Sequence, residues 1–300
     1  MAAFAASGRL LPEYFVAHWS RSYGFAPSSP LVFEQNSTPN PRKAKPDMLL
    51  AIDVGNTETK LGCFSDGKLR QTWRVTTERR RTPDEYGVFF TQLFATSELE
   101  RGAIDAVVIA SVVPQLDPVL ESACVRFFGT APRFFTPQAQ GLIEVVTENP
   151  SEVGADLVAA AVGGVDRFGA PLIVISFGTA TVFIAISREG KYLGVAIAPG
   201  IAVSVDALIG RTAKLPQIAL EAPGCAIGRN TVEALQSGIV FGFTGQTEAI
   251  VARIRAEMGV DAKVVATGGL AEVVAKQTPV IDAVDPHLSL VGLELFHRKL

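Results

Sequence analysis

The stretch that decides the fold begins at residue 49 and reads Leu49-Leu50-Ala51-Ile52-Asp53-Val54-Gly55-Asn56-Thr57. An apolar run ends there in an acidic residue and a glycine turn, and residues 172–181, LIVISFGTAT, repeat the apolar run and the glycine turn with Ser176 in place of the acidic residue. Each copy continues with a strand, a glycine turn (Asp66-Gly67 or Glu189-Gly190) and a returning strand. Two unrelated antiparallel hairpins would look alike, but the shared Gly-Thr turn favours an internal duplication.

The segments between the hairpins alternate helix and strand. Thr82-Pro83-Asp84-Glu85 predicts a capped helix that runs to about Leu93, with a buried strand at 106–111 and a helix at 117–127. Asn149-Pro150-Ser151-Glu152 predicts the start of an alanine-rich helix that ends before Gly169. The pattern predicts an α/β protein of two similar domains, residues 48–165 and 166–300.

Residues 1–47 differ from the rest of the chain. They contain several prolines, lack a steady periodicity and lack the uninterrupted apolar core of a secretory signal. Met48 then opens the first strand abruptly. We expect either that Met48 is the true start or that residues 1–47 are a poorly ordered extension.

Composition excludes several classes of protein. The chain has 300 residues, 48% of them hydrophobic, which is enough for two packed cores, and its net charge of -3 argues against a nucleic-acid partner. It lacks the run of about 18 apolar residues that a membrane helix requires. Cys63, Cys124 and Cys225 form no CxxC pair, so we expect buried thiols in a reduced, cytoplasmic protein.

The two glycine turns have the chemistry of a phosphate site. Such a turn needs backbone N–H groups aimed at the anion, a close approach of the backbone, and uncharged donors. Gly55 and Gly178 allow the close approach. The hydroxyl and amide donors are Asn56, Thr57, Thr179 and Thr181.

Two further features indicate a nucleotide. Asp53 ends a buried strand, where a carboxylate is costly unless it has a task such as holding hydrated Mg²⁺ against phosphates. Residues 264–271, VVATGGLA, predict a strand, two glycines and a helix. Although this is also an ordinary strand-to-helix turn, its place after the two phosphate-type loops fits an adenosine site.

At this point the chain resembles the type III pantothenate kinases over nearly all of residues 48–300. The resemblance rests on these motifs, in order: MLLAIDVGNTETKLG, DEYG, IASVVPQL, NPSEVGAD, FGTAT, AIAPGI, GRNTVEALQSG, ATGGLA and DPHLSLVGL. It implies an actin-like ATPase fold of two ribonuclease-H-like domains with an interdomain nucleotide cleft. It also implies a homodimer that uses ATP to phosphorylate pantothenate, the first step of coenzyme A biosynthesis.

The resemblance also implies roles for individual residues. ATP would be bound by Thr179 and by the segment Asp53, Val54, Gly55, Asn56, Thr57, Glu58, Thr59 and Lys60. Pantothenate would meet Thr147, Gly154, Ala155, Asp156 and Leu157, with Thr231 near the dimer interface. Asp156 would be the general base, and its place near the start of the alanine-rich helix agrees, although an acidic residue there also complements a helix N-terminus.

Four positions depart from the family pattern. Ser176 stands where an aspartate resembling a monovalent-cation ligand is usual, so we expect a weaker dependence on K⁺ or NH₄⁺. Leu157 replaces an arginine, so the guanidinium N–H donors that would lie beside the proposed base are absent. Thr147 replaces a substrate-contacting tyrosine and Val182 a threonine. These changes leave open an ATP-binding paralogue with a regulatory role, or a kinase for another small alcohol or sugar.

Overall fold

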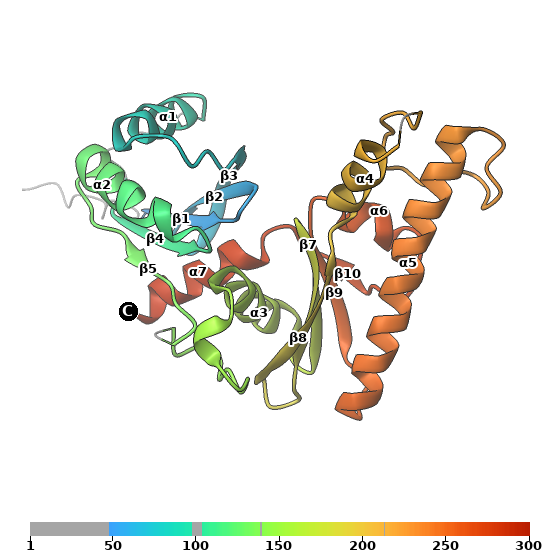
Figure 1. The fold of residues 1–300 in the computed structure, drawn as a ribbon. Coiled ribbons are helices and arrows are strands. Elements are labelled where there is room, and N and C mark those ends of the chain that lie inside the picture. The colour runs from blue at the N-terminus through green and yellow to red at the C-terminus, as the bar shows by residue number, and fades with distance from the viewer. Residues whose placement is uncertain (1–47, 98–103, 139, 213) are drawn as a thin grey trace, which may run out of the picture. The chain divides into compact units, whose positions relative to one another are not determined.

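The computed structural model describes residues 48–97, 104–138, 140–212 and 214–300, and the expectation for residues 1–47 lies outside them. The chain forms two five-stranded sheets, ordered β3-β2-β1-β4-β5 and β8-β7-β6-β9-β10 (Figure 1). In both sheets the first three strands pair antiparallel and the last two are parallel to the central strand. The equal order and direction confirm the predicted α/β fold of two similar halves.

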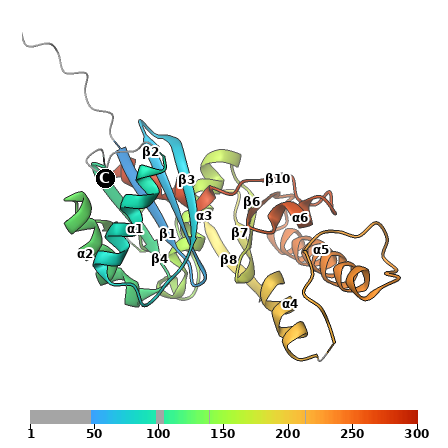
Figure 2. The ribbon, with the colours of Figure 1, turned by 90° about the horizontal axis from the view of Figure 1, so that it is seen from above.

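The first sheet contains β1 (Met48–Val54), β2 (Glu58–Ser65), β3 (Lys68–Thr76), β4 (Ala106–Ser111) and β5 (Arg133–Phe134). Its outer face is covered by α1 (Pro83–Ala95) and α2 (Asp117–Phe128), with the short 3₁₀ helix η2 (Pro114–Leu116) before α2 (Figure 2). Thr82 and Glu85 form the predicted capping box, which satisfies two backbone donors at the start of α1. α1 ends two residues beyond the predicted Leu93.

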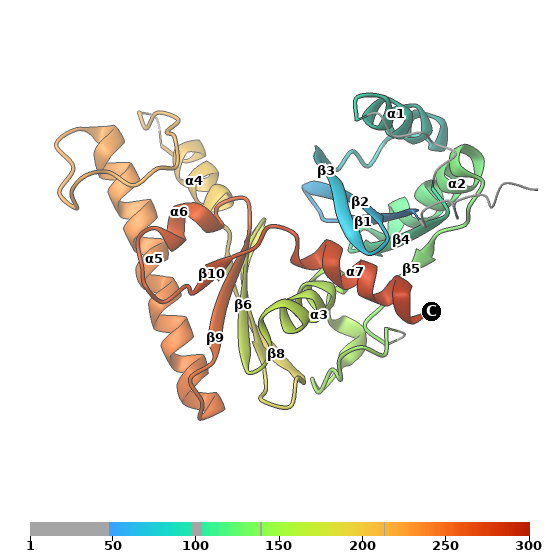
Figure 3. The ribbon, with the colours of Figure 1, turned by 180° about the vertical axis from the view of Figure 1, so that it is seen from behind.

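The second sheet contains β6 (Leu172–Phe177), β7 (Ala180–Ile186), β8 (Tyr192–Pro199), β9 (Lys263–Gly268) and β10 (Ala283–Val284). Its outer face packs against α4 (Ile201–Gly210), the long α5 (Thr231–Met258) and α6 (Ala271–Ala275) (Figure 3). Within the described ranges, no helix has both the length and the apolar character needed to cross a membrane.

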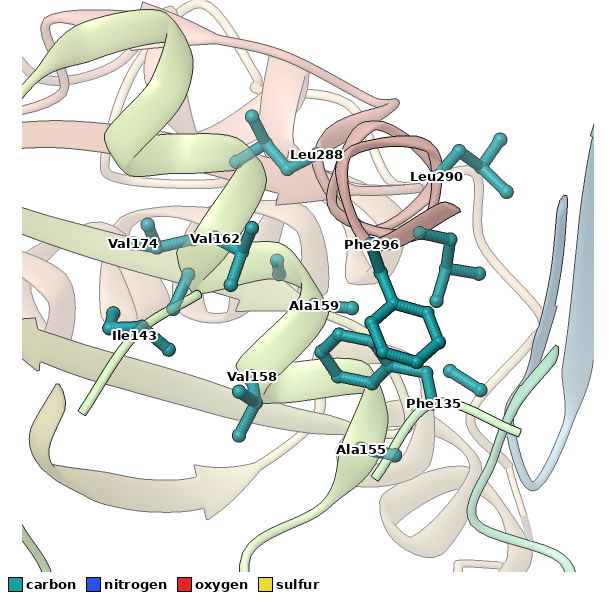
Figure 4. Packing of buried hydrophobic residues seen from close by; sticks show 14 of the residues in the cluster. Phe135, Ile143, Ala155, Val158, Ala159, Val162, Val174, Leu288, Leu290 and Phe296 are labelled. Atoms are coloured by element: carbon teal, nitrogen blue, oxygen red, sulfur yellow. The ribbon is translucent and has the colours of Figure 1, made fainter. Parts of the chain in front are cut away.

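Two helices, α3 (Ala155–Phe168) and α7 (Leu288–Lys299), pack against the inner faces of both sheets. Their buried side chains form one cluster with residues of β1, β4, β6 and β7 (Figure 4). Phe135 and Phe296 meet edge to face in this cluster, with ring centroids 5.3 Å apart. The central layer therefore joins the two halves through one continuous core.

Glycines allow α3 and α7 to approach backbone to backbone. A Cβ atom added to Gly292 would lie 2.0 Å from the Ala159 carbonyl oxygen, and one added to Gly163 would lie 2.1 Å from the Leu288 carbonyl oxygen. Both obstacles are backbone atoms, which no side-chain rotation can move away. Each helix thus requires a glycine where it crosses the other.

Three details differ from the sequence-based expectations. Asn149 caps a separate 3₁₀ helix, η3 (Pro150–Glu152), and α3 begins only at Ala155 because Val153 and Gly154 are extended. Cys225 is exposed, so the expectation of three buried thiols was wrong; Cys63 and Cys124 are buried. The boundary predicted between residues 165 and 166 falls inside α3, and the division of the chain into domains stays a prediction.

The helix crossing can be tested by adding one methyl group. Gly292→Ala should destabilise the protein by about 1–3 kcal/mol or more, because overpacking against a backbone carbonyl forces the two helices apart. Denaturant unfolding of the full chain measures the change. Gly210→Ala is the control: this helical glycine has open space around it and should keep or slightly raise stability. Equal stability of the Gly292 variant and the wild type would contradict the close crossing.

Candidate active site

Two hydrogen bonds to Gly55, one from within the loop and one from Thr77, hold the loop between β1 and β2 in shape. The Gly55 N–H donates to the Glu58 carbonyl at 3.0 Å, and the Thr77 hydroxyl donates to the Gly55 carbonyl at 2.7 Å. A Cβ on Gly55 would lie 2.8 Å from the Glu58 oxygen, so the tight turn requires glycine. Asn56 and Thr57 are exposed at its tip, where their donors are open to an anion.

The corresponding loop between β6 and β7 meets the first one. The hydroxyls of Thr57 and Thr179 lie 2.9 Å apart, although 122 residues separate them in sequence. Gly178 and Thr179 are exposed. Gly200 packs directly against this second loop. A Cβ at Gly200 would lie only 2.3 Å from the Thr179 carbonyl oxygen, so this close approach requires glycine. The structure thus brings the two predicted phosphate loops together at their tips.

Basic side chains surround the first loop. The Arg74 guanidinium donates to both carboxylate oxygens of Glu58, at 2.7 and 2.9 Å, and Arg79 donates to the Asn56 side-chain oxygen at 2.8 Å. Lys60 lies 3.5 Å from the Asp53 carboxylate. Arg74 and Lys60 are paired with carboxylates, whereas Arg79 donates to an uncharged amide oxygen, so Arg79 adds positive charge beside the loop that favours an anion.

The predicted adenosine turn lies within reach of the same group. Gly268 has a φ of +98° and lies so close to β6 that a Cβ would stand 2.3 Å from the Phe177 carbonyl oxygen. Arg74 extends to Gly269, where a Cβ would lie 3.1 Å from its Nη2 atom. Arg74 therefore links the first phosphate loop to the glycine turn of the second half.

Asp53, the second-last residue of β1, is a buried carboxylate with two polar partners. Its Oδ2 atom accepts a hydrogen bond from the Ser289 hydroxyl of α7 at 2.6 Å and pairs with Lys60. In the ranges that the structure describes, no cluster of three or more His, Cys, Asp or Glu side chains is arranged to hold a metal ion by itself. The donors fit Mg²⁺, which is commonly held by one or two carboxylates together with substrate phosphates and water.

Asp156 is the second residue of α3, as expected, and is half-buried. Its Oδ1 atom accepts the Leu157 backbone N–H at 2.9 Å. Burial raises the pKa of Asp156 to about 6, and the negative charge of Asp53 acts in the same direction. The Leu157 N–H and the charge of Lys60 oppose the rise. Two carboxylates and a lysine, from β1, β2 and α3, thus form one electrostatic group.

The remaining predicted site residues differ in burial and make few polar contacts. Val54 and Thr59 are buried, and the Thr59 hydroxyl bonds to that of Thr77 at 2.8 Å. Ser176 is half-buried in β6, while Leu157 packs against the central cluster. Thr231 is exposed at the start of α5. Among the described residues, no hydrogen bond or ion pair joins Val54, Thr59, Ser176 or Thr231 to Asp156, whereas the Leu157 backbone N–H donates to its carboxylate.

The sequence alone did not point to several of these partners. Ser289, Arg74 and Thr77 lie far along the chain from the loop they support, and residue type alone does not distinguish them from ordinary polar residues. Tyr192 is a further example. It is fully buried at the start of β8, and the charge of Asp156 acts on its phenol.

Comparison with known protein families gives a specific match. The family model described as type III pantothenate kinase matches residues 49–253. The type III pantothenate kinases of Anaeromyxobacter sp. (strain K) and Anaeromyxobacter dehalogenans (strain 2CP-C) are each 48% identical over 252 residues. These matches cover 84% of this chain and 99% of each relative.

Solved structures support the fold alone. A protein described as a Baf family transcriptional activator from Campylobacter jejuni aligns with a TM-score of 0.50 at 18% identity, covering 83% of this chain and 98% of that one. A reductive activator for a corrinoid, iron-sulfur protein aligns with a TM-score of 0.51 at 14% identity, covering 85% and 61%. By the family model and the curated relatives, this chain belongs to the type III pantothenate kinase family.

Proposed function

We propose that this protein transfers the γ-phosphoryl group of ATP to the primary hydroxyl of pantothenate, giving phosphopantothenate and ADP, the first step of coenzyme A biosynthesis. The observation that carries the proposal is the pairing of Asp53 and Asp156 around Lys60, beside two loops that meet at Thr57 and Thr179. The identity of the phosphoryl acceptor, pantothenate, is inferred from family membership, because the relatives are named as pantothenate kinases.

The residues divide the reaction between them. Asp156 accepts the proton of the pantothenate hydroxyl as the hydroxyl oxygen bonds to the γ-phosphorus. The bond from that phosphorus to the bridging oxygen of the β-phosphate breaks, and its electron pair leaves with ADP. Gly55, Asn56, Thr57 and Thr179 hold the phosphates, and Lys60 offsets their charge. Mg²⁺, organised by Asp53 through water, would neutralise the charge on the phosphate oxygens.

The environments of the two carboxylates suit two different tasks. Asp53 accepts a hydrogen bond from Ser289 and has Lys60 as a partner, an arrangement that suits a carboxylate holding a hydrated cation. No side-chain donor among the described residues bonds to the Asp156 carboxyl, and burial raises its pKa to about 6. A pKa near neutrality suits a group that must both accept and release a proton.

Two further expectations concern assembly and location. We expect a homodimer in the cytoplasm with no nucleic-acid or membrane partner. β8 exposes Leu193, Val195 and Ile197, and Ile227 before α5 is 83% exposed. Apolar side chains gathered on one strand favour burial against a second copy. Thr231, which follows closely, would then lie near the interface.

A coupled ADP-release assay with ATP, Mg²⁺ and pantothenate tests the role of Asp156. Asp156→Asn should lower kcat by about 10²–10³-fold, because the amide cannot take the proton.

The same variant should melt at a higher temperature than the wild type above pH 6. The raised pKa of Asp156 means that the folded protein disfavours its ionised carboxylate, and asparagine removes that charge. Normal turnover in this variant would remove Asp156 as the base. ATP binding without turnover in the wild type would favour the regulatory paralogue.

The pH dependence of the wild type follows from the same group. The base must be ionised, so kcat/KM should fall tenfold per pH unit below a pKa of about 6 and be level above it until another group titrates. Rate measurements from pH 5 to 8 with saturating ATP would show this limb. A limb near pH 4, the usual range of an exposed aspartate, would contradict the burial of Asp156.

The monovalent-cation requirement should be weak. Ser176 offers a neutral hydroxyl at the position proposed for this ion, and a hydroxyl binds K⁺ less strongly than a carboxylate. Replacing KCl by a bulky organic chloride should change kcat by less than about threefold, and Ser176→Asp should increase the response to K⁺. A strict K⁺ requirement in the wild type would show that other groups build the cation site.

A further inference from the structure

The Ser289 hydroxyl is a buried donor whose acceptor is the Asp53 carboxylate. It donates to the Asp53 Oδ2 atom at 2.6 Å, and each of the two residues is only 5% exposed. Ser289 belongs to α7 and Asp53 to β1, so the bond joins segments 236 residues apart in sequence. A hydroxyl that bonds to one carboxylate oxygen restricts the rotation of the whole group, and such bonds to a charged acceptor are among the stronger ones.

The position of Ser289 is itself fixed by contacts between α7 and α3. Leu288, the first residue of α7, packs its carbonyl oxygen so closely against α3 that a Cβ added to Gly163 would lie 2.1 Å from it (Figure 4). Shortly before the helix, the buried carboxylate of Asp285 pairs with Arg167, which also belongs to α3. The start of α7 is thus anchored at two points, and the Ser289 donor is in place before any ligand binds.

The two oxygens of the Asp53 carboxylate have different surroundings. The Lys60 Nζ atom lies 3.5 Å from Oδ2, the oxygen that already accepts the bond from Ser289. Within the described ranges, no hydrogen bond is made to Oδ1. The carboxylate is therefore held through one oxygen and keeps the other available. Because Mg²⁺ retains several waters in a near-ideal octahedron, a carboxylate oxygen with a fixed position suits its water shell better than a freely rotating one.

We propose that Ser289 is a positioning residue for the carboxylate that organises the metal: its hydroxyl holds Asp53 Oδ2 and so leaves Oδ1 available to the water shell of Mg²⁺. This inference rests on the proposed function, in which Asp53 serves ATP-bound Mg²⁺. Without the hydroxyl, the ion pair with Lys60 is the remaining polar contact of the Asp53 side chain within the described structure, and it draws the carboxylate towards the lysine. Loss of such an outer partner typically weakens metal binding 10–100-fold.

Thr278 provides a matched control within the same chain. It is 6% exposed, and its hydroxyl donates to the Glu248 Oε1 atom of α5 at 2.7 Å. Ser289→Ala and Thr278→Val each delete a buried hydroxyl that bonds to a carboxylate. Both variants should therefore melt at a lower temperature than the wild type. The bond from Thr278 lies outside the proposed site, so only the Ser289 variant should change metal binding.

The experiment measures the Kd of ADP for the full chain by equilibrium dialysis, once with EDTA and once with Mn²⁺ as the metal probe. The ratio of the two Kd values reports what the metal adds to nucleotide binding. Ser289→Ala should lower this ratio about tenfold, with the Kd in EDTA within about twofold of the wild type. Thr278→Val should leave the ratio unchanged. Ser289→Cys, which keeps a weak donor of similar shape, should give an intermediate ratio.

A second background tests whether Ser289 acts through Asp53. Asp53→Asn should itself lower the ratio, and adding Ser289→Ala to it should change the ratio by less than about twofold. In the coupled assay, Ser289→Ala should raise the Mg²⁺ concentration that gives half of the maximal rate about tenfold, while kcat at saturating Mg²⁺ stays within about threefold.

Two outcomes would overturn the inference. A wild-type ratio in Ser289→Ala together with a lower melting temperature would make the hydroxyl structural, and a further large loss in the Asp53→Asn background would show that it acts on another group. A wild type inactive on pantothenate would instead refute the proposed function. The dialysis experiment still decides in that case, because ADP and Mn²⁺ bind without the acceptor: a lowered ratio supports the role of Ser289 and an unchanged ratio refutes it.

Discussion

The close crossing of α3 and α7 is the constraint on which the rest of the structure depends. Gly163 and Gly292 let the two backbones touch, and the paired helices then fill the space between the inner faces of both sheets. α3 carries Asp156 at its start, and α7 carries Ser289 one residue after its own start. The same crossing that joins the two cores therefore sets where Asp156 lies relative to Asp53 near the end of β1.

The candidate site lies where two halves of equal sheet topology meet. Each sheet ends its central strand in a glycine loop, and the loops meet through Thr57 and Thr179. The halves have diverged in charge at this point, because β1 ends near Asp53 whereas the equivalent strand carries Ser176. One half thus carries a carboxylate at this position and the other a neutral hydroxyl, and the proposed ATP site would use both.

Local chemistry made much of the fold predictable from the sequence. The capping box at Thr82, the two hairpin turns and the strand at 106–111 all depend on neighbouring residues. The pairing of α3 with α7 was not predictable, because the contact joins segments more than 100 residues apart and rests on two glycines that look ordinary in sequence. The bond from Ser289 to Asp53 spans 236 residues and was missed for the same reason.

The candidate site divides in the same way. The glycine loops, Asp53 and Asp156 were predicted from motifs, whereas the contacts of Arg74 and Thr77 with the first loop emerge only from the folded structure. The central claim is that this site moves a phosphoryl group onto an alcohol, which product analysis tests most directly. Mass spectrometry and ³¹P NMR of a reaction with ATP, Mg²⁺ and pantothenate should show one phosphate monoester on the primary hydroxyl for each ADP formed. ADP formation with pantothenate left unmodified would contradict the account.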